Sequence, residues 1–454
     1  MDFKGKKVAV IGVGIEGVST AKYLIDKGAE PVLFDKKNIG EFERSVGEEI
    51  KKLRVLTFLG REYLDSLQNF DLVFRSPGVR PDLPALQRAE KKGAKITSQT
   101  KLFFDLCPAP IIGITGTKGK GTTSALIYDI LKTAGKKVFL GGNIGNPPLA
   151  FLGKVTQDSI VVLELSSFQL IDINKSPHIC VVLMVTSEHL DWHRGEDEYI
   201  KAKTQITKYQ TAKDFAVIND DYPTSREIGE ISKARKYYFS TKKPVENGAY
   251  IDQGFVVLVT NGWTSIVKTS DIKLIGEHNL QNIAAATVVA GLLEIPPDTV
   301  AKAIKAFTGL PHRLEFVGEV SSVKFYDDSA STIPETTVAA VQAFENPKIL
   351  ILGGASKHSD FTLLGKAIVQ NNIKAAILTG EEAVRIRDSI DSAGGFSGKI
   401  IEGPSDMKQI VQKAKTLSEL GDIVLLSPAC ASFDMYKNYM DRGEQFKAAV
   451  RSLG

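Results

Sequence analysis

The sequence predicts an α/β protein of three domains, in which helices cover mostly parallel sheets. Its 454 residues exceed what one hydrophobic core holds. Short, wholly apolar runs recur along the chain, as in KKVAVIG, PIIGI and KILILGG. Such runs are typical of parallel strands that are buried on both faces. Several of them end in glycine-rich turns that lead into helical patterns. We place the domains at residues 1–98, 99–308 and 309–454.

Composition narrows the class of protein. Hydrophobic residues make up 43% and charged residues 24%, which is ordinary for a soluble globular chain. The net charge of +4 is too small and too dispersed to favour nucleic-acid binding. No apolar stretch is long enough for a membrane span, and the first residues enter a strand without a signal peptide. The three cysteines have no metal spacing. We therefore expect a cytoplasmic enzyme, a monomer acting on small molecules, with no nucleic-acid partner and no membrane span.

The stretch 110–123 predicts a nucleotide triphosphate site. An apolar strand ends in a glycine-rich turn, and a helix follows with Thr122 and Thr123 in its first turn. Glycines let backbone amides approach a phosphate chain, Lys120 adds a point charge, and the helix N-terminus attracts anions. A threonine hydroxyl at that helix start can bind Mg²⁺. The predicted nucleotide-binding residues of this loop are Gly116, Thr117, Lys118, Gly119, Lys120, Gly121, Thr122 and Thr123.

This loop departs from the general P-loop at two positions. Ile114 stands where that pattern has glycine, and Gly121 stands where it has serine or threonine. A glycine-rich turn without a ligand is the plain alternative. TGTKGKGTT resembles the TGTNGK(S/T) loop of the Mur ligase family, ATP-dependent enzymes that form amide bonds in peptidoglycan synthesis. The resemblance implies a central P-loop-type ATPase sheet that binds ATP.

The N-terminal domain carries a dinucleotide-type fingerprint. Gly12, Gly14 and Gly17 follow a strand, and Asp35 lies where an acid would bind a ribose. By itself this pattern leaves nicotinamide or flavin binding and a ligand-free turn open, on a Rossmann-like domain. A second strand ends in a Ser-Pro-Gly turn at the same sheet edge. Resemblance to the glutamate-adding Mur ligases implies contacts to the uridine diphosphate of a substrate from Gly14, Ile15, Glu16, Asp35, Lys36, Ser76, Pro77 and Gly78.

Polar residues at the ends of the next two strands suggest metal binding. Glu164 ends the run SIVVLE beside the phosphate loop, where an acid can hold Mg²⁺ or merely cap a loop. His189 follows the next strand and could bind a metal or a carbonyl group. GGNIG and ELSSFQL resemble the glutamate-adding ligases; this resemblance implies Asn143 on the substrate side and His189, rather than His193, as a second Mg²⁺ ligand.

Lys203 aligns with a lysine that the family carries as a carbamate, and a solvated helix lysine is the alternative. The resemblance thus implies two Mg²⁺ ions, with Thr122, Glu164, His189 and carbamylated Lys203 as ligands. Asn279 begins an alanine-rich helical stretch and either caps it or, as the family implies, binds ATP. Residues 219–275 alternate irregularly, which favours antiparallel strands at the edge of the central sheet.

The C-terminal domain is predicted to be Rossmann-like, because KILILGG, KAAILTG and DIVLLSP read as parallel strands. Arg313 could neutralise phosphate charge, and Asp328 matches the acid of the family pattern NDSKATN. Ala330 replaces the lysine of that pattern and Ile333 its asparagine. The lost cation should weaken ATP contacts unless Lys324 or Lys357 compensates.

SPACASFDMYKNYMDRG closely resembles a stretch of the glutamate-adding ligases. It implies an amino-acid site in which Ser432 and Phe433 offer donors at a helix N-terminus. Thr332, Lys357 and Tyr439 complete that predicted site, and Tyr439 stands where the family has phenylalanine.

Together these features predict an ATP-dependent ligase of an acid and an amino acid. The resemblance to the glutamate-adding ligases implies that ATP phosphorylates the alanine carboxylate of UDP-N-acetylmuramoyl-alanine and that the amine of glutamate, taken as the D-enantiomer, displaces phosphate. The predicted catalytic residues are Lys120, Glu164, His189, Lys203 and Arg313. A folylpolyglutamate-synthase-like ligase and a Mur ligase that adds L-glutamate are alternatives within the ligases. A nicotinamide dehydrogenase and a nucleotide-binding protein without activity are alternatives from other classes.

Overall fold

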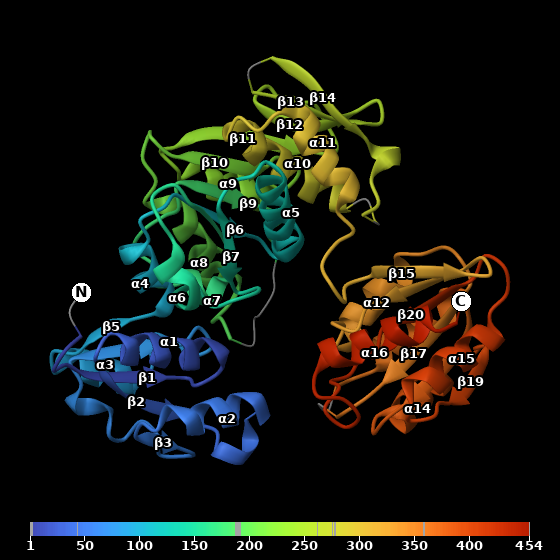
Figure 1. The fold of residues 1–454 in the computed structure, drawn as a ribbon, viewed down its shortest axis with the longest axis horizontal. Coiled ribbons are helices and arrows are strands. Elements are labelled where there is room, and N and C mark those ends of the chain that lie inside the picture. Colours follow the sequence, from blue (N-terminus) through green and yellow to red (C-terminus); the bar gives the residue numbers. More distant parts are fainter. Residues whose placement is uncertain are drawn as a thin grey trace. The chain divides into compact units, whose positions relative to one another are not determined.

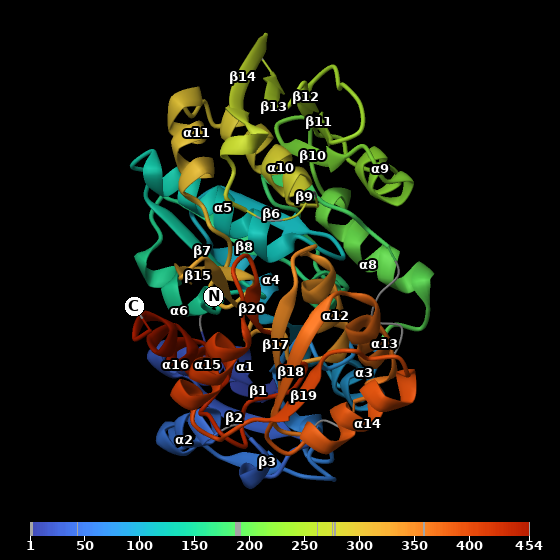
Figure 2. The same cartoon turned by 90° about the vertical axis from the view of Figure 1, so that its right-hand side faces the viewer.

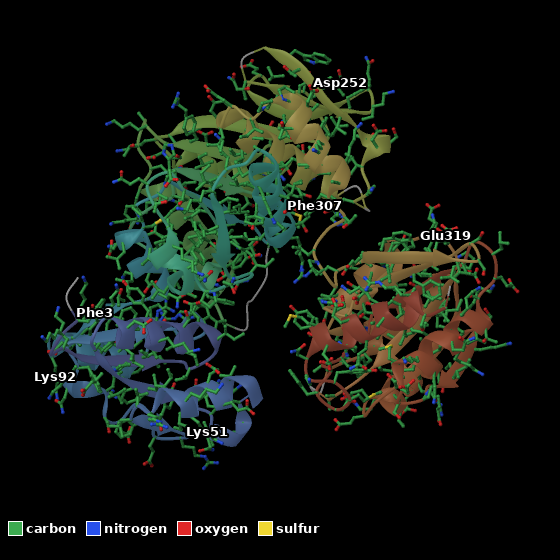
Figure 3. All side chains as sticks on the ribbon, in the orientation of Figure 1. Phe3, Lys51, Lys92, Asp252, Phe307 and Glu319 are labelled. Carbon is green, nitrogen blue, oxygen red and sulfur yellow. The ribbon has the colours of Figure 1, made fainter. Side chains whose placement is uncertain are left out.

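The computed structural model describes residues 3–42, 44–186, 192–260, 262–274, 276, 278–356 and 359–453. It divides into two compact units (Figure 1). The first unit holds Met1–Ile272 and Glu277–Phe307, and the second holds Lys273–Gly276 and Thr308–Gly454. Figure 3 marks Phe307, where the first unit ends, and Glu319 within the second. In the described ranges, no helix has the length and apolar character needed to cross a membrane.

The first sheet is wholly parallel, as a Rossmann-like domain requires. Its strands run in the order β3-β2-β1-β4-β5, and they are β1 (Lys7–Ile11), β2 (Glu30–Asp35), β3 (Thr57–Leu59), β4 (Leu72–Arg75) and β5 (Lys95–Thr97). Its helices are α1 (Ile15–Asp26), α2 (Arg44–Leu53), α3 (Pro84–Lys91) and the 3₁₀ turns η1 (Ile39–Glu41) and η2 (Leu67–Asn69). The next helix, α4 (Gln99–Leu106), follows β5 and contacts α6 (Pro148–Phe151). Val8 and Val10 belong to one core with α1, whereas Ala9 and Ile11 belong to another with α3. Both faces of β1 are therefore buried, which explains its apolar run.

The second sheet of the first unit has nine strands and an antiparallel edge. The prediction of antiparallel strands is confirmed for residues 248–268 but is wrong for residues 235–240, which pair parallel with both neighbouring strands. Its order is β14-β13-β12-β11-β10-β9-β6-β8-β7, and only β12-β13-β14 pair antiparallel. The strands are β6 (Ile111–Thr115), β7 (Val138–Gly142), β8 (Ile160–Glu164), β9 (Ile179–Val182), β10 (Phe215–Asn219), β11 (Arg235–Ser240), β12 (Gly248–Asp252), β13 (Phe255–Val259) and β14 (Trp263–Lys268). The helices are α5 (Lys120–Thr133), α6 (Pro148–Phe151), α7 (Ser167–Leu170), α8 (Glu196–Lys208), α9 (Pro223–Glu230), α10 (His278–Leu292), α11 (Pro297–Ala306), η3 (Leu152–Lys154) and η4 (Thr269–Asp271).

The central parallel strands place β6 between β8 and β9. Their carboxyl ends therefore share one edge of the sheet, where α/β proteins bind ligands. The alanine-rich stretch forms α10, whose small side chains are buried and allow it to pack closely on α5. Because both sheets lie in one compact unit, the boundary that we predicted at residue 98 stays a prediction.

The second unit contains one six-stranded sheet with helices on both faces. Its order is β15-β16-β20-β17-β18-β19, parallel except for β15 with β16. The strands are β15 (Glu315–Val320), β16 (Val323–Asp327), β17 (Lys348–Gly353), β18 (Ile373–Thr379), β19 (Lys399–Glu402) and β20 (Ile423–Leu426). One face packs against α12 (Pro334–Gln342), α13 (Thr362–Gln370) and α14 (Ala383–Ala393), and the other against α15 (Met407–Leu417) and α16 (Tyr439–Arg451) (Figure 2). The prediction of a parallel C-terminal sheet with helices on both faces is confirmed.

Candidate active site

The predicted phosphate loop connects β6 to α5 at the carboxyl edge of the central sheet. Gly119 precedes α5 and has φ +86°, a left-handed conformation that favours glycine. A Cβ atom at Gly119 would lie 2.3 Å from Asn282 Oδ1 on α10. Gly119 is therefore required both by its backbone angle and by the close approach of α10.

Thr117 anchors the loop to the segment that follows β9. Its backbone N–H donates to Met184 O at 2.7 Å, and its hydroxyl donates to Thr186 O at 2.8 Å. The same hydroxyl accepts from Thr186 N at 2.9 Å and lies 3.0 Å from the Tyr199 hydroxyl. The Thr117 side chain is buried, and these hydrogen bonds fix the conformation of the loop.

Lys120 lies over the carbonyl groups of the same loop. Its Nζ donates to Gly116 O and to Thr117 O, both at 3.0 Å. The ammonium group is thus held beside the N-terminus of α5. A fixed positive charge there adds to the attraction of the helix end for anions.

The two threonines at the start of α5 have different surroundings. Thr123 is buried, and its hydroxyl donates to Asn282 Oδ1 at 3.2 Å. Asn282 Nδ2 in turn donates to Asn279 Oδ1 at 2.8 Å, so these three side chains form one chain of hydrogen bonds. The Thr122 side chain is half-buried and lies in the same first turn. Sequence reasoning missed Asn282, although its spacing of three from Asn279 places both amides on one helix face.

Glu164 and Asn143, predicted from separate motifs, are direct partners. Asn143 Nδ2 donates to Glu164 Oε1 at 2.8 Å, and Asn143 N donates to Glu164 O at 2.9 Å. Glu164 ends β8 with 5% of its surface exposed, next to β6 and the phosphate loop. A carboxylate oriented by an amide at this edge suits a hard cation such as Mg²⁺.

Lys203 is a buried member of the same site. It is 1% exposed on α8, and its Nζ donates to Gly116 O at 2.8 Å. The amine also lies 4.6 Å from the centre of the Tyr199 ring. The alternative of a solvated helix lysine is therefore wrong, because long charged side chains are rarely buried without a specific role.

Two predicted residues, His189 and Lys357, lie outside the described residues. His193, the histidine that we ranked second, is buried in a cluster of rings. Its Nε2 lies 2.9 Å from Ser167 Oγ, and its ring stacks on Phe168 at 5.6 Å. His193 thus packs the segment before α8 against α7.

The three predicted segments of the uridine diphosphate site meet at the edge of the first sheet. A Cβ atom at Gly17 would lie 2.2 Å from Gly12 O, so only glycine allows this close turn. The Ser76 hydroxyl donates to Gly12 O, which joins the Ser-Pro-Gly turn to the glycine turn. Asp35 accepts from Val13 N at 2.6 Å and from Lys37 N at 2.9 Å. Around these contacts, the exposed residues of the predicted set are Gly14, Ile15, Lys36 and Gly78.

Sequence reasoning also missed Arg75, which joins the two sheets of the first unit. Arg75 is 1% exposed at the end of β4. Its guanidinium donates to Val79 O at 2.6 Å and to Asp172 Oδ1 at 2.8 Å, beyond α7. In the sequence, a charged residue at the end of the apolar run LVFR could have indicated this role of Arg75.

In the second unit, Asp328 follows β16 and is buried. Its Oδ2 accepts from Ser427 Oγ at 2.7 Å, and its Oδ1 accepts from Leu314 N at 3.2 Å. Burial raises the pKa of Asp328 to about 6. Arg313, beside Leu314, has an exposed side chain.

The suggestion that Lys324 compensates for Ala330 stays a prediction. Lys324 is exposed near the beginning of β16, whereas Ala330 follows the end of that strand. At about 3.3 Å per residue, the strand carries the backbone about 10 Å from Lys324 to Asp327, and Ala330 follows in the turn beyond. The Ala330 backbone N–H donates to His312 O, so this turn is held without a lysine.

One group in the described part of the second unit has the spacing of a metal site: His312, Glu315 and Asp327. His312 Nδ1 lies 2.7 Å from Asp327 Oδ2, and Lys447 Nζ lies 3.1 Å from Glu315 Oε2. A hydrogen bond and an ion pair therefore account for these side chains. We assign no metal to them.

The expected helix N-terminus at Ser432 and Phe433 is wrong. Residues 432–438 form turns, and α16 begins at Tyr439, after Asn438 whose side chain accepts from Asp441 N. Ser432 is buried, while Phe433 is 53% exposed. Thr332 is half-buried in the turn after β16, and Tyr439 packs edge-on against the His312 ring.

Arg442 on α16 was missed by sequence reasoning and connects two turns of this unit. Its guanidinium donates to Ser329 Oγ at 2.9 Å and to Cys430 O at 3.1 Å. The turn that carries Thr332 and the turn that carries Ser432 therefore share one buried cation.

Three family models match consecutive parts of the chain. The model described as Mur ligase MurD-like, N-terminal domain, matches residues 6–98. The Mur ligase middle domain matches residues 114–290, and the Mur ligase, glutamate ligase domain, matches residues 312–430.

Full-length relatives and solved structures agree with these matches. The chain is 40% identical to the UDP-N-acetylmuramoylalanine–D-glutamate ligase of Acetivibrio thermocellus and 41% identical to that of Clostridium tetani, each over 99% of this chain and 97% of the relative. Its fold is similar to that of the UDP-N-acetylmuramate-alanine ligase of Thermotoga maritima, with a TM-score of 0.60 and 18% identity, covering 99% of this chain and 100% of that one. It is also similar to MurF of Acinetobacter baumannii, with a TM-score of 0.59 and 15% identity, covering 94% and 86%.

Proposed function

The chain belongs to the Mur ligase family of ATP-dependent ligases, and we propose that it joins D-glutamate to UDP-N-acetylmuramoyl-L-alanine in peptidoglycan precursor synthesis. The observation that carries this proposal is 40–41% identity over the full length to relatives of that name. Those relatives favour this reaction over the folylpolyglutamate-synthase-like alternative. We place the reaction in the cytoplasm and expect a monomer.

In the proposed reaction, the alanine carboxylate attacks the γ-phosphorus of ATP, and ADP leaves. The amine of glutamate then attacks the acyl carbon, loses a proton and displaces inorganic phosphate, which leaves an amide. No side chain becomes covalently bound. We propose that Lys120 and the amides of residues 116–123 hold the phosphate groups in position, with Asn279, Arg313 and Asp328 as further nucleotide contacts.

We propose that Mg²⁺ accompanies ATP and that Thr122, Glu164 and His189 bind it. The hydroxyl and carboxylate oxygens of Thr122 and Glu164 are ligands that Mg²⁺ prefers, and the Asn143 amide orients Glu164. When bound, Mg²⁺ would neutralise charge on the transferred phosphoryl group.

We also propose that Lys203 becomes a carbamate. A neutral Lys203 amine that adds carbon dioxide loses a proton and becomes an anion, which suits a neighbouring cation. Its burial against Gly116 would protect such a group from bulk water. NMR of the enzyme in ¹³C-bicarbonate, with Lys203→Met as the control, tests this; a spectrum without a lysine-dependent carbamate signal contradicts it.

The substrate residues stay proposals. The uridine diphosphate would contact Gly14, Ile15, Glu16, Asp35, Lys36, Ser76, Pro77, Gly78 and Asn143. Glutamate would contact Thr332, Lys357, Ser432, Phe433 and Tyr439.

The test is a direct assay of product mass. The protein is incubated with ATP, UDP-N-acetylmuramoyl-L-alanine and either enantiomer of glutamate. We expect ADP, phosphate and one added glutamyl residue with the D-enantiomer. Addition of L-glutamate instead, or no addition with either, would overturn the proposed substrate.

A further inference from the structure

Glu16 is a carboxylic acid in the first turn of α1 whose side chain faces the central domain. Its Oε2 accepts a long hydrogen bond of 3.5 Å from Gln169 Nε2 on α7. Its Oε1 is buried and has no hydrogen-bond partner among the described residues. Burial raises the pKa of Glu16 to about 7, although the Gln169 hydrogen bond and the Arg75 charge lower it. The carboxyl group is therefore partly protonated at neutral pH.

The groups that face Glu16 give an ionised carboxylate little compensation. From β4, Arg75 is the charged neighbour. Its two terminal amino groups donate to Asp172 from beyond α7 and to backbone carbonyls, whereas its buried Nε has no hydrogen-bond partner among the described residues. From α4, Gln99 Nε2 donates to Glu16 O at 3.0 Å. Gln99 Oε1 is a second buried acceptor without a partner in the described part of the chain. A proton on the Glu16 carboxyl group would turn one of its two oxygens from a hydrogen-bond acceptor into a donor.

The position of Glu16 matters because the same turn begins the proposed diphosphate site. Gly14, Ile15 and Glu16 lead into α1, and a helix N-terminus attracts a diphosphate through its amides and dipole. An ionised carboxylate in that turn repels a second anion, whereas a protonated one is neutral.

We propose that Glu16 links binding at the nucleotide site to a proton: the diphosphate of a UDP-sugar binds the form of the protein in which the Glu16 carboxyl carries a proton. The inference rests on the proposed function, because it uses the uridine diphosphate site. Above the pKa of this carboxyl, binding takes up one proton from solution.

The expected pH dependence follows from the fraction of protein that is competent to bind. With a pKa of about 7, the dissociation constant of a UDP-sugar should be about tenfold weaker at pH 8 than at pH 6. Glu16→Gln keeps the shape of the side chain but stays neutral, so its dissociation constant should not change over this range. The control Glu90→Gln, the same change at an exposed position of α3, should keep the pH dependence of the wild type.

Calorimetry of the full chain tests the proposal without relying on a variant alone. UDP-N-acetylglucosamine and UDP-N-acetylmuramoyl-L-alanine are titrated at pH 6, 7 and 8 in pairs of buffers that differ in ionisation enthalpy. We expect the wild type to take up close to one proton at pH 8 and almost none at pH 6. Binding without proton uptake at pH 8, or an unchanged pH dependence in Glu16→Gln, would overturn the inference.

The outcomes separate this inference from the proposed function. If the wild type adds D-glutamate to the precursor but binds it without a proton, only the role of Glu16 is wrong. If it binds neither UDP compound at any pH and forms no product, the uridine diphosphate site itself is wrong, and the inference falls with it.

Discussion

Asn143 and Glu164 are joined by two hydrogen bonds, from backbone N–H to backbone carbonyl at 2.9 Å and from side-chain amide to carboxylate at 2.8 Å. The pair ties the end of β7 to the end of β8 at the ligand edge of the central sheet. One residue thereby fixes the orientation of the acid that we propose for Mg²⁺.

Asn143→Ala should weaken the binding of Mg²⁺, because mutation of a residue that orients a metal ligand lowers metal affinity or activity by about 10–100-fold. We expect the Mg²⁺ concentration for half-maximal activity to rise by about that factor, with little change in folding. A titration of activity against Mg²⁺ measures this. Asn146→Ala, an exposed change in the same connection, is the control. An unchanged Mg²⁺ requirement in Asn143→Ala would contradict the proposal that Glu164, oriented by Asn143, binds Mg²⁺.

Lys120→Ala should reduce ATP turnover by at least about 10²-fold, because it removes a charge held beside the phosphate loop. Steady-state release of ADP measures the effect. Lys132→Ala removes an exposed lysine from the last turn of the same helix and should retain activity. Near-normal turnover by Lys120→Ala would mean that the phosphate loop is misinterpreted.

Gly119→Ala combines a strained backbone with a collision. A left-handed alanine alone costs about 1–2 kcal/mol, and the new Cβ would also lie 2.3 Å from Asn282 Oδ1. Gly135→Ala is the matched control, since Gly135 also has a left-handed φ, +69°, but open space around its Cβ position. Thermal unfolding should show a larger loss of stability for Gly119→Ala, together with loss of ATP binding. Equal losses of stability in the two variants would show that α10 shifts to accommodate the new Cβ atom without any further loss of stability.

The raised pKa of Asp328 predicts a pH-dependent stability. A buried acid whose pKa is raised to about 6 favours folding most when it is protonated. This contribution is present below about pH 4 and is lost as the pH rises through about 6; it amounts to at most about 3 kcal/mol. Asp328→Asn cannot ionise, so its stability relative to the wild type should improve between about pH 4 and pH 7.

Denaturant unfolding of the full chain at several pH values measures this difference in the transition midpoint. Asp388→Asn, at an exposed position of α14, is the control and should follow the wild type at every pH. A difference between wild type and Asp328→Asn that does not vary with pH would contradict the assignment.

The sequence by itself determined the features whose chemistry is local. Glycine spacing and Lys120 marked the phosphate loop, because a tight turn and a nearby charge need only neighbouring residues. Apolar runs predicted the parallel strands, since burial on both faces leaves no polar alternation. The motif after DIVLLSP was found, but its helix start was misplaced. Ser432 and Asn438 both suit the residue before a helix, and in the structure Asn438 takes that place, where its side chain accepts from Asp441 N.

The tertiary structure alone decided which distant residues meet. Lys203 is buried because α8 places its amine on Gly116 O, and Asn282 reaches Gly119 because α10 packs on α5. Periodicity describes the face of one element, whereas burial and hydrogen bonding between elements depend on how the whole chain closes around them.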